Sequence, residues 1–213
     1  FTIYAPTDYL DGRGDLWWLA LENALARLDR ITVRIDGMER ALPLTTCDEK
    51  DAAYHTIYWW LRRIDEADAR ATVGEICREA NYDVGSLCSD LIMSWDELRT
   101  LAADPLVTIG AHTRRHFSLA KLTDTMAHAE LSEGRARLER ELGKPVRHVA
   151  YPFGDETAAG PREFSIAREL GFASGVTTRK GLVQAKHASE LTALPRVSLN
   201  GDYQDPRYVK VLL

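Results

Sequence analysis

Several features that would narrow the class of protein are missing from this sequence. It has three cysteines in 213 residues, Cys47, Cys77 and Cys88, and their odd number and wide spacing exclude a disulfide framework or a zinc ribbon. No window approaches the roughly 20 apolar residues that a membrane-spanning helix needs. The net charge is −5, without the basic stripe that a phosphate backbone would require. We therefore expect no membrane span and no nucleic-acid partner.

What the sequence does contain suffices for one folded domain over residues 1–213. A chain of this length buries roughly 70% of its unfolded surface, which provides a real hydrophobic core. The chain starts with Phe1-Thr2-Ile3-Tyr4-Ala5, which is typical of the interior of a strand and lacks an initiating methionine. We therefore expect further residues upstream.

The spacing of apolar residues predicts strands that alternate with helices. Strand-like runs occupy 1–5, 31–35, 38–42, 106–109, 146–151, 172–177 and 194–199. Helical spacing, with capping boxes at Thr46 and Ser94, occupies about 15–28, 46–61, 66–80, 94–104, 123–142 and 162–170. Asp36-Gly37 predicts a tight hairpin between two of the strands. This alternation indicates an α/β fold with a parallel sheet covered by helices.

The segment from Ile109 to His116 places two imidazoles, His112 and His116, four residues apart where a strand ends. Neutral imidazole is a common ligand of zinc-like ions, and two imidazoles on a turn entering a helix can reach one ion. The H-x-x-x-H pattern alone is common in proteins that bind no metal. Its position matters, because functional residues of parallel α/β folds collect at the carboxyl ends of strands.

Two other strand ends carry suggestive residues, namely Tyr151-Pro152-Phe153-Gly154 and Arg196. Together with the histidine pair, they resemble the polysaccharide deacetylase family with its NodB-homology domain. The second motif of this family is H-[ST]-x-x-H, and its third is a strand that ends in an aromatic-Pro-aromatic-Gly turn. The resemblance covers about 91–200, and it implies a distorted (β/α) barrel with 11–90 as a mostly helical insertion that contains a β-hairpin.

The resemblance implies a metal-dependent hydrolase that removes acetyl groups from N-acetylated sugars of a polysaccharide or oligosaccharide. His112 and His116 match the metal ligands, and the divalent metal is expected to be zinc. The backbone N–H of Tyr151 matches the oxyanion donor, Pro152 would fix the turn, and the rings of Tyr151 and Phe153 would offer flat surfaces to a sugar. The Thr113 hydroxyl would accept a nearby N–H and orient the loop.

Arg196 has two interpretations: it orients a catalytic carboxylate or binds substrate, as the family's buried arginine does, or it pairs with a structural acid.

The chain departs from the family pattern at both ends. The family's aspartate pair, which supplies the third metal ligand and the catalytic base, does not occur here, so we expect it upstream of Phe1. Asp8 could replace a ligand, although capping of its loop is the simpler role. The general acid is not identified, because His187 lies in a polar loop. Without the first βα segment the barrel would be incomplete at its N-terminus and open on one side, where a homo-oligomer could form.

Two alternatives remain open beside the deacetylase. One is a sugar-binding or assembly module of the same fold that lacks the aspartate base. The other is a related hydrolase that cleaves the C–N bond of a small amide. A zinc peptidase is disfavoured, because Thr113 stands where H-E-x-x-H has its catalytic glutamate.

Overall fold

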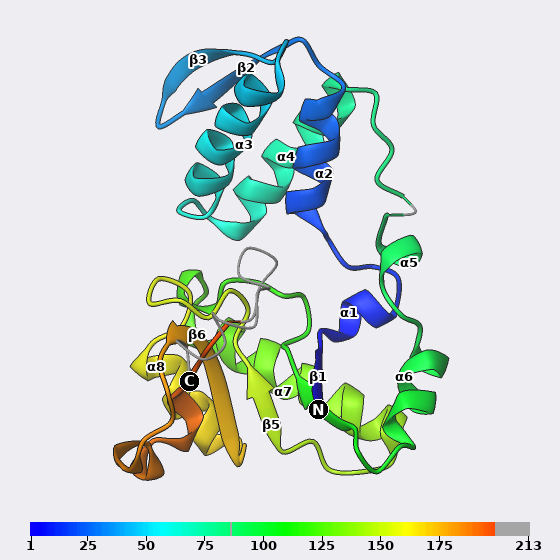
Figure 1. The fold of residues 1–213 in the computed structure, drawn as a ribbon, viewed down its shortest axis with the longest axis vertical. Helices are drawn as coiled ribbons and strands as arrows, with labels where there is room; N and C mark the ends of the chain where they lie inside the picture. Colours follow the sequence, from blue (N-terminus) through cyan, green and yellow to red (C-terminus); the bar gives the residue numbers. More distant parts are fainter. Residues whose placement is uncertain (86, 199–213) are drawn as a thin grey trace, which may run out of the picture. The chain divides into compact units, whose positions relative to one another are not determined.

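The computed structural model describes residues 1–85 and 87–198, which divide between two compact units. The sheet unit combines Phe1–Gly14 with the described residues from Met93 onward, and the helical unit is Asp15–Ile92. Figure 1 traces both units. Each has its own buried residues, so each is described separately.

The sheet unit is built on five parallel strands in the order β1-β4-β5-β6-β7. Their bounds are β1 Thr2–Ala5, β4 Thr108–Ala111, β5 His148–Ala150, β6 Ser174–Lys180 and β7 Leu194–Arg196. β1 and β4 pair with Tyr4 opposite Gly110, where a Cβ would come within 2.5 Å of the Tyr4 ring. Because all five strands run the same way, the loops that follow them gather at one edge of the sheet.

Helices and short 3₁₀ segments connect these strands. They are α1 Thr7–Leu10, α6 Trp95–Ala102, η1 Leu119–Lys121, α7 Asp124–Leu142, α8 Pro161–Glu169, η2 Ala185–Ser189 and η3 Leu191–Ala193. α7 is the longest and buries Ala127, Leu131 and Leu138 in the core of this unit. It ends at Gly143, whose left-handed φ of 64° suits glycine.

The helical unit combines helices with a two-stranded hairpin, as Figure 1 shows. Its elements are α2 Trp17–Ala26, β2 Arg30–Ile35, β3 Met38–Pro43, α3 Cys47–Leu61, α4 Glu66–Glu79 and α5 Leu87–Leu91. One face of β2 is buried, since Ile31, Val33 and Ile35 alternate with exposed residues. The hairpin turns at Asp36 and Gly37, both with positive φ, as the Asp-Gly pair predicts.

The α/β prediction is confirmed, and most differences concern strand limits. β4 begins at Thr108 and ends at Ala111, two residues later than predicted. The last predicted strand is observed as Leu194–Arg196, and Leu199 lies outside the described residues. Among the described residues, no strand pairs with the outer edge of β1, and no helix is both long and apolar enough to cross a bilayer.

Candidate metal and active site

The two histidines of the H-x-x-x-H motif lie together directly after β4. Their ring centroids are 4.7 Å apart, and the ring planes meet at 74°. Both side chains are half-buried at the carboxyl edge of the sheet. The ring of His116 also contacts Tyr9, from α1, with centroids 5.8 Å apart. The structure thus brings the predicted pair together at the expected edge.

His112 is held in one orientation by the neighbouring strand. Its Nδ1 lies 2.6 Å from the carbonyl oxygen of Ala150, at the end of β5. A carbonyl can only accept, so Nδ1 carries the proton and Nε2 keeps its lone pair. Burial lowers the pKa of His112 to about 4, the Ala150 carbonyl opposes this shift, and the charge of Arg196 adds to it. A neutral imidazole with a fixed Nε2 is what a zinc-like ion requires, so this residue fits a metal.

The sequence suggested that the histidines lie on a turn that enters a helix. In the structure the loop between them is not helical. Thr113 and His116 both have left-handed φ values, 64° and 60°. The Thr113 hydroxyl accepts the backbone N–H of His116 at 3.0 Å, which confirms the predicted role of this side chain. That bond closes a tight turn and brings the second imidazole back beside the first.

The Tyr151-Pro152-Phe153-Gly154 turn follows β5 and lies beside the pair. The Phe153 ring is half-buried and meets His116 edge to face at 5.1 Å. Phe153 and Gly154 have positive φ, and a Cβ on Gly154 would come within 2.8 Å of the Thr178 nitrogen. The turn therefore packs closely on β6 and aims Phe153 at the histidines.

Tyr151 occupies a different environment from the one expected. Its ring is 1% exposed, and its hydroxyl donates to the Thr192 carbonyl at 2.7 Å. Burial raises the pKa of this phenol. Its backbone N–H donates to the Val176 carbonyl at 3.2 Å, a bond that an oxyanion would have to replace. Pro152 is buried too. As a correction, the flat surface expected of the Tyr151 ring does not face solvent, and Phe153 alone of these three is partly accessible.

Arg196 is exposed at the end of β7, and its Nε donates to the Thr177 carbonyl at 2.6 Å. No carboxylate of the described residues forms an ion pair with it, so the structural-acid interpretation has no partner there. Its charge acts on His112 and also on Tyr4, whose pKa burial raises.

The described residues contain no group of three His, Cys, Asp or Glu that could hold a metal. Asp8, the candidate replacement ligand, instead pairs with Arg114 Nε at 3.2 Å and with Arg13 at 3.7 Å. Asp11 accepts the Trp95 indole N–H at 2.8 Å. These carboxylates therefore fix loops of the sheet unit.

Two contacts of the site were not found from the sequence. One is the Ala150 carbonyl, because a backbone acceptor leaves no signal in residue type. The other is Glu130 of α7, whose buried carboxylate contacts the loop between the histidines. A glutamate on the apolar face of an amphipathic helix is a signal that could have identified it.

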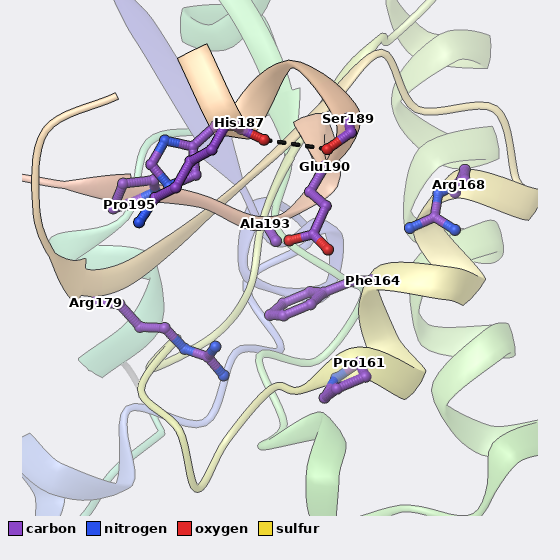
Figure 2. Close-up of a pocket in the computed structure, with 10 residues that line it drawn as sticks. Pro161, Phe164, Arg168, Arg179, His187, Ser189, Glu190, Ala193 and Pro195 are labelled. Carbon is purple, nitrogen blue, oxygen red and sulfur yellow. Dashed lines mark hydrogen bonds between the residues drawn. The ribbon is translucent and has the colours of Figure 1, made fainter. Parts of the chain in front are cut away.

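A hollow of about 620 Å³ lies beside α8 and the η2 segment, and Figure 2 shows it. Its lining includes Phe164, Arg179 and Glu190, with Arg179 stacked over the Phe164 ring at 5.1 Å. His187 lines it as well and accepts the backbone N–H of Gln184 at 2.8 Å. The described residues that line this hollow include none of the residues predicted to act in catalysis, substrate binding or metal binding.

Comparisons with known proteins identify the family. The family model for polysaccharide deacetylase matches residues 51–174, which include the histidine pair and the Tyr151 turn. A search of curated proteins finds no match.

Among solved structures, a polysaccharide deacetylase from Bacillus cereus is 22% identical over 57% of this chain and 37% of its own, with a TM-score of 0.50. A Streptococcus pyogenes deacetylase, solved with acetate, is 18% identical over 60% and 57% of the two chains, with a TM-score of 0.47. IcaB from Ammonifex degensii is 25% identical over 57% and 52%, with a TM-score of 0.46.

The chain thus spans between about a third and three fifths of the length of these proteins. The likeness to the Bacillus structure concerns the fold. The family model covers more than half of the sequence and both motif-bearing strand ends, and on that ground the chain belongs to the polysaccharide deacetylase family.

Proposed function

We propose that this chain is a metal-dependent deacetylase that removes acetyl groups from N-acetylated sugars of a polysaccharide or oligosaccharide. The observation that carries the proposal is the His112–His116 pair, with rings 4.7 Å apart and the Nδ1 of His112 bound to a carbonyl. Family membership supports the reaction class, a hydrolase acting on C–N bonds. The sugar and the polymer are inferred from the family.

His112 and His116 would hold the metal, which we propose to be zinc. A bound divalent ion polarises an acetamide carbonyl and supplies a water nucleophile near neutral pH. The Ala150 carbonyl orients the His112 ring, because it fixes the proton on Nδ1 and leaves Nε2 for coordination. The low pKa of His112, about 4, keeps that nitrogen unprotonated at pH 7.

Two further residues would act on the substrate. The half-buried Phe153 ring beside His116 offers an apolar surface to a sugar. The exposed Arg196 guanidinium, whose charge already acts on His112, would stabilise negative charge that develops on the acetamide oxygen. We leave Tyr151 out of this scheme, because its N–H and hydroxyl both have protein acceptors.

One observation favours a second candidate, a sugar-binding or assembly module of the same fold. No described carboxylate joins the histidine pair, so the described residues provide neither a third ligand nor a base. Such a module would bind the glycan without releasing acetate.

Acetate release separates these candidates. The complete protein, including the residues expected upstream of Phe1, is treated with a chelator, reloaded with zinc and incubated with an N-acetylglucosamine oligomer. We expect zinc-dependent acetate release that falls to background in His112→Ala and His116→Ala. His128→Ala, an exposed histidine of α7, serves as the control and should retain activity.

Oligomer binding without acetate release by the zinc-loaded complete protein would overturn the enzyme and favour the module. Release from a small amide alone would favour the other C–N hydrolase.

A further inference from the structure

α7 presents a buried carboxylate to the loop between the two histidines. The Glu130 side chain is 1% exposed and lies on the same helix face as Ala127, Leu131 and Leu138. Burying a carboxylate costs several kcal/mol unless it is paired and hydrogen-bonded. Its partners therefore indicate what this residue does.

These partners are Arg114 and Arg115, two of the three residues that separate His112 from His116. Oε2 of Glu130 accepts the backbone N–H of Arg114 at 3.2 Å and that of Arg115 at 2.8 Å. Oε1 accepts the Arg115 Nε–H at 2.5 Å. One carboxylate thus binds two consecutive backbone amides, which fixes the path of the chain between the imidazoles.

A second feature of α7 brings the same loop close, one helical turn further on. A Cβ on Gly134 would lie 2.7 Å from both the carbonyl carbon and the carbonyl oxygen of Thr113. Real Cβ atoms do not approach so closely, so the loop backbone would have to move. Residues four apart share a helix face, and Glu130 and Gly134 therefore form one surface of α7 on which the loop packs.

The loop needs these contacts with α7 because its backbone is strained. Thr113 and His116 both have left-handed φ values, which cost of order 1–3 kcal/mol each and persist only when surrounding contacts hold them. On its other side the loop is bound by α1, since the Asp8 N–H donates to the Arg114 carbonyl at 2.9 Å. The Thr113 hydroxyl holds the amide of His116. The amides of Arg114, Arg115 and His116 all have protein acceptors.

We propose that Glu130 is a positioning residue of the metal site. It holds the backbone between the histidines so that both imidazoles converge before metal arrives, and Gly134 provides the room for this contact. The inference rests on the proposed function only in taking the histidine pair to be the metal site. Glu130 itself does not touch the metal or the substrate.

The test compares Glu130→Gln with Glu133→Gln in the full chain. Glu133 lies on the same helix and pairs with the Arg114 side chain at 2.8 Å, but it is 55% exposed and accepts no backbone N–H among the described residues. In Glu130→Gln one acceptor oxygen becomes an NH₂ donor and the negative charge is lost, so the side chain can no longer accept from both the loop amides and the Arg115 guanidinium. We expect the zinc dissociation constant to rise about 10- to 100-fold, as when a group that orients a ligand is lost.

Amide exchange in the metal-free chain is the second readout. The amides of Arg114 and Arg115 should exchange at least about tenfold faster in Glu130→Gln, since each loses a charged acceptor. Glu133→Gln should leave both the zinc affinity and these two amides within about twofold of wild type, because exposed ion pairs contribute little.

A stability control separates positioning from a merely structural role. Leu138→Ala removes a buried apolar side chain of α7 that has no polar contact with the loop. It should lower the melting temperature and leave the zinc affinity unchanged. Equal zinc affinity in Glu130→Gln and Glu133→Gln, or a loss that Leu138→Ala reproduces, would overturn the inference.

Two safeguards keep these outcomes distinct. If Glu130→Gln does not fold, Glu130→Asp keeps the charge but shortens the reach, and it should show the same two changes to a smaller degree. A wild-type chain that binds no zinc at the histidines would refute the proposed function. Exchange at Arg114 and Arg115 would still decide the role of Glu130 in holding the loop.

Discussion

Single hydrogen bonds set the geometry of the histidine site. The Ala150 carbonyl fixes the ring of His112, and the Thr113 hydroxyl fixes the backbone of His116. Both acceptors come from the edge of the sheet where parallel strands end, so their positions follow from the fold. The two imidazoles are therefore arranged by contacts with the protein.

Replacing the Thr113 hydroxyl tests this arrangement. Thr113→Val keeps the β-branched shape at the same left-handed φ but leaves the His116 N–H without its acceptor. We expect a loss of about 1–2 kcal/mol in the free energy of unfolding by urea, together with weaker zinc binding. Thr113→Ser retains the hydroxyl, so it should bind zinc nearly as the wild type does. Equal zinc affinity in the valine variant would show that the turn does not depend on this bond.

The sequence predicted the convergence of His112 and His116, because their spacing and place after a strand are local properties. It also predicted the hydroxyl bond of Thr113. It did not predict the burial of Tyr151, because the acceptor of its hydroxyl, Thr192, lies 41 residues further along the chain. The contact of Glu130 with the loop is likewise set by how α7 packs on the sheet edge.

The loop between the histidines depends on helix α7. Gly134 of this helix can be compared with Gly74 of α4. Gly134→Ala places a Cβ against the Thr113 carbonyl and should destabilise the protein by about 1–3 kcal/mol. Gly74→Ala in α4 meets nothing within 4 Å, so its better helix propensity should stabilise by about 0.5–1 kcal/mol. Thermal unfolding of both variants checks this, and changes of the same sign would contradict the close contact.

Glu139, near the C-terminal end of α7, should make the stability of the protein depend on pH. Burial of Glu139 disfavours its charged form, but the Val146 N–H and Arg135 outweigh that effect and lower its pKa. A lowered carboxylate pKa adds stability above the unfolded value of about 4.3, and this is lost as the pH falls through the folded pKa. Glu139→Gln should therefore be less stable than wild type at pH 7, with the difference shrinking towards pH 3. Urea unfolding at both pH values would reveal a constant difference if this reasoning were wrong.

Longer elements were predicted well, because capping residues and the spacing of apolar residues are local properties of the sequence. The capping boxes at Thr46 and Ser94 both form, and Thr123 caps α7 as the pattern indicates. The short helices α1 and α5 were not predicted, because four or five residues give too little periodicity. The limits of β4 were misjudged because Gly110 and Ala111 carry little strand preference, and pairing with β1 and β5 places them in the sheet.

The chain contains two compact units with separate buried residues. We therefore expect that one unit can be destabilised while the other stays folded. Ile57 is fully buried in α3 of the helical unit. Ile57→Ala should cost about 2–5 kcal/mol and accelerate amide exchange in α2, α3 and α4. Amides of β4, β5 and β6 in the sheet unit should retain their protection. Loss of protection in both units, measured by hydrogen exchange, would show that they unfold together. The prediction of one domain with an insertion at 11–90 stays a prediction.

At the scale of the whole sheet, parallel strands bring the ends of β4, β5 and β7 to one edge, where the histidine pair contacts Phe153 and where Arg196 also lies. The central claim is that this edge binds a metal through His112 and His116. The most direct measurement is anomalous diffraction at the zinc edge from a crystal of the chain soaked in zinc. We predict one peak about 2.0–2.1 Å from Nε2 of His112 and from a ring nitrogen of His116. Zinc bound only elsewhere, with no peak between the two rings, would contradict the account.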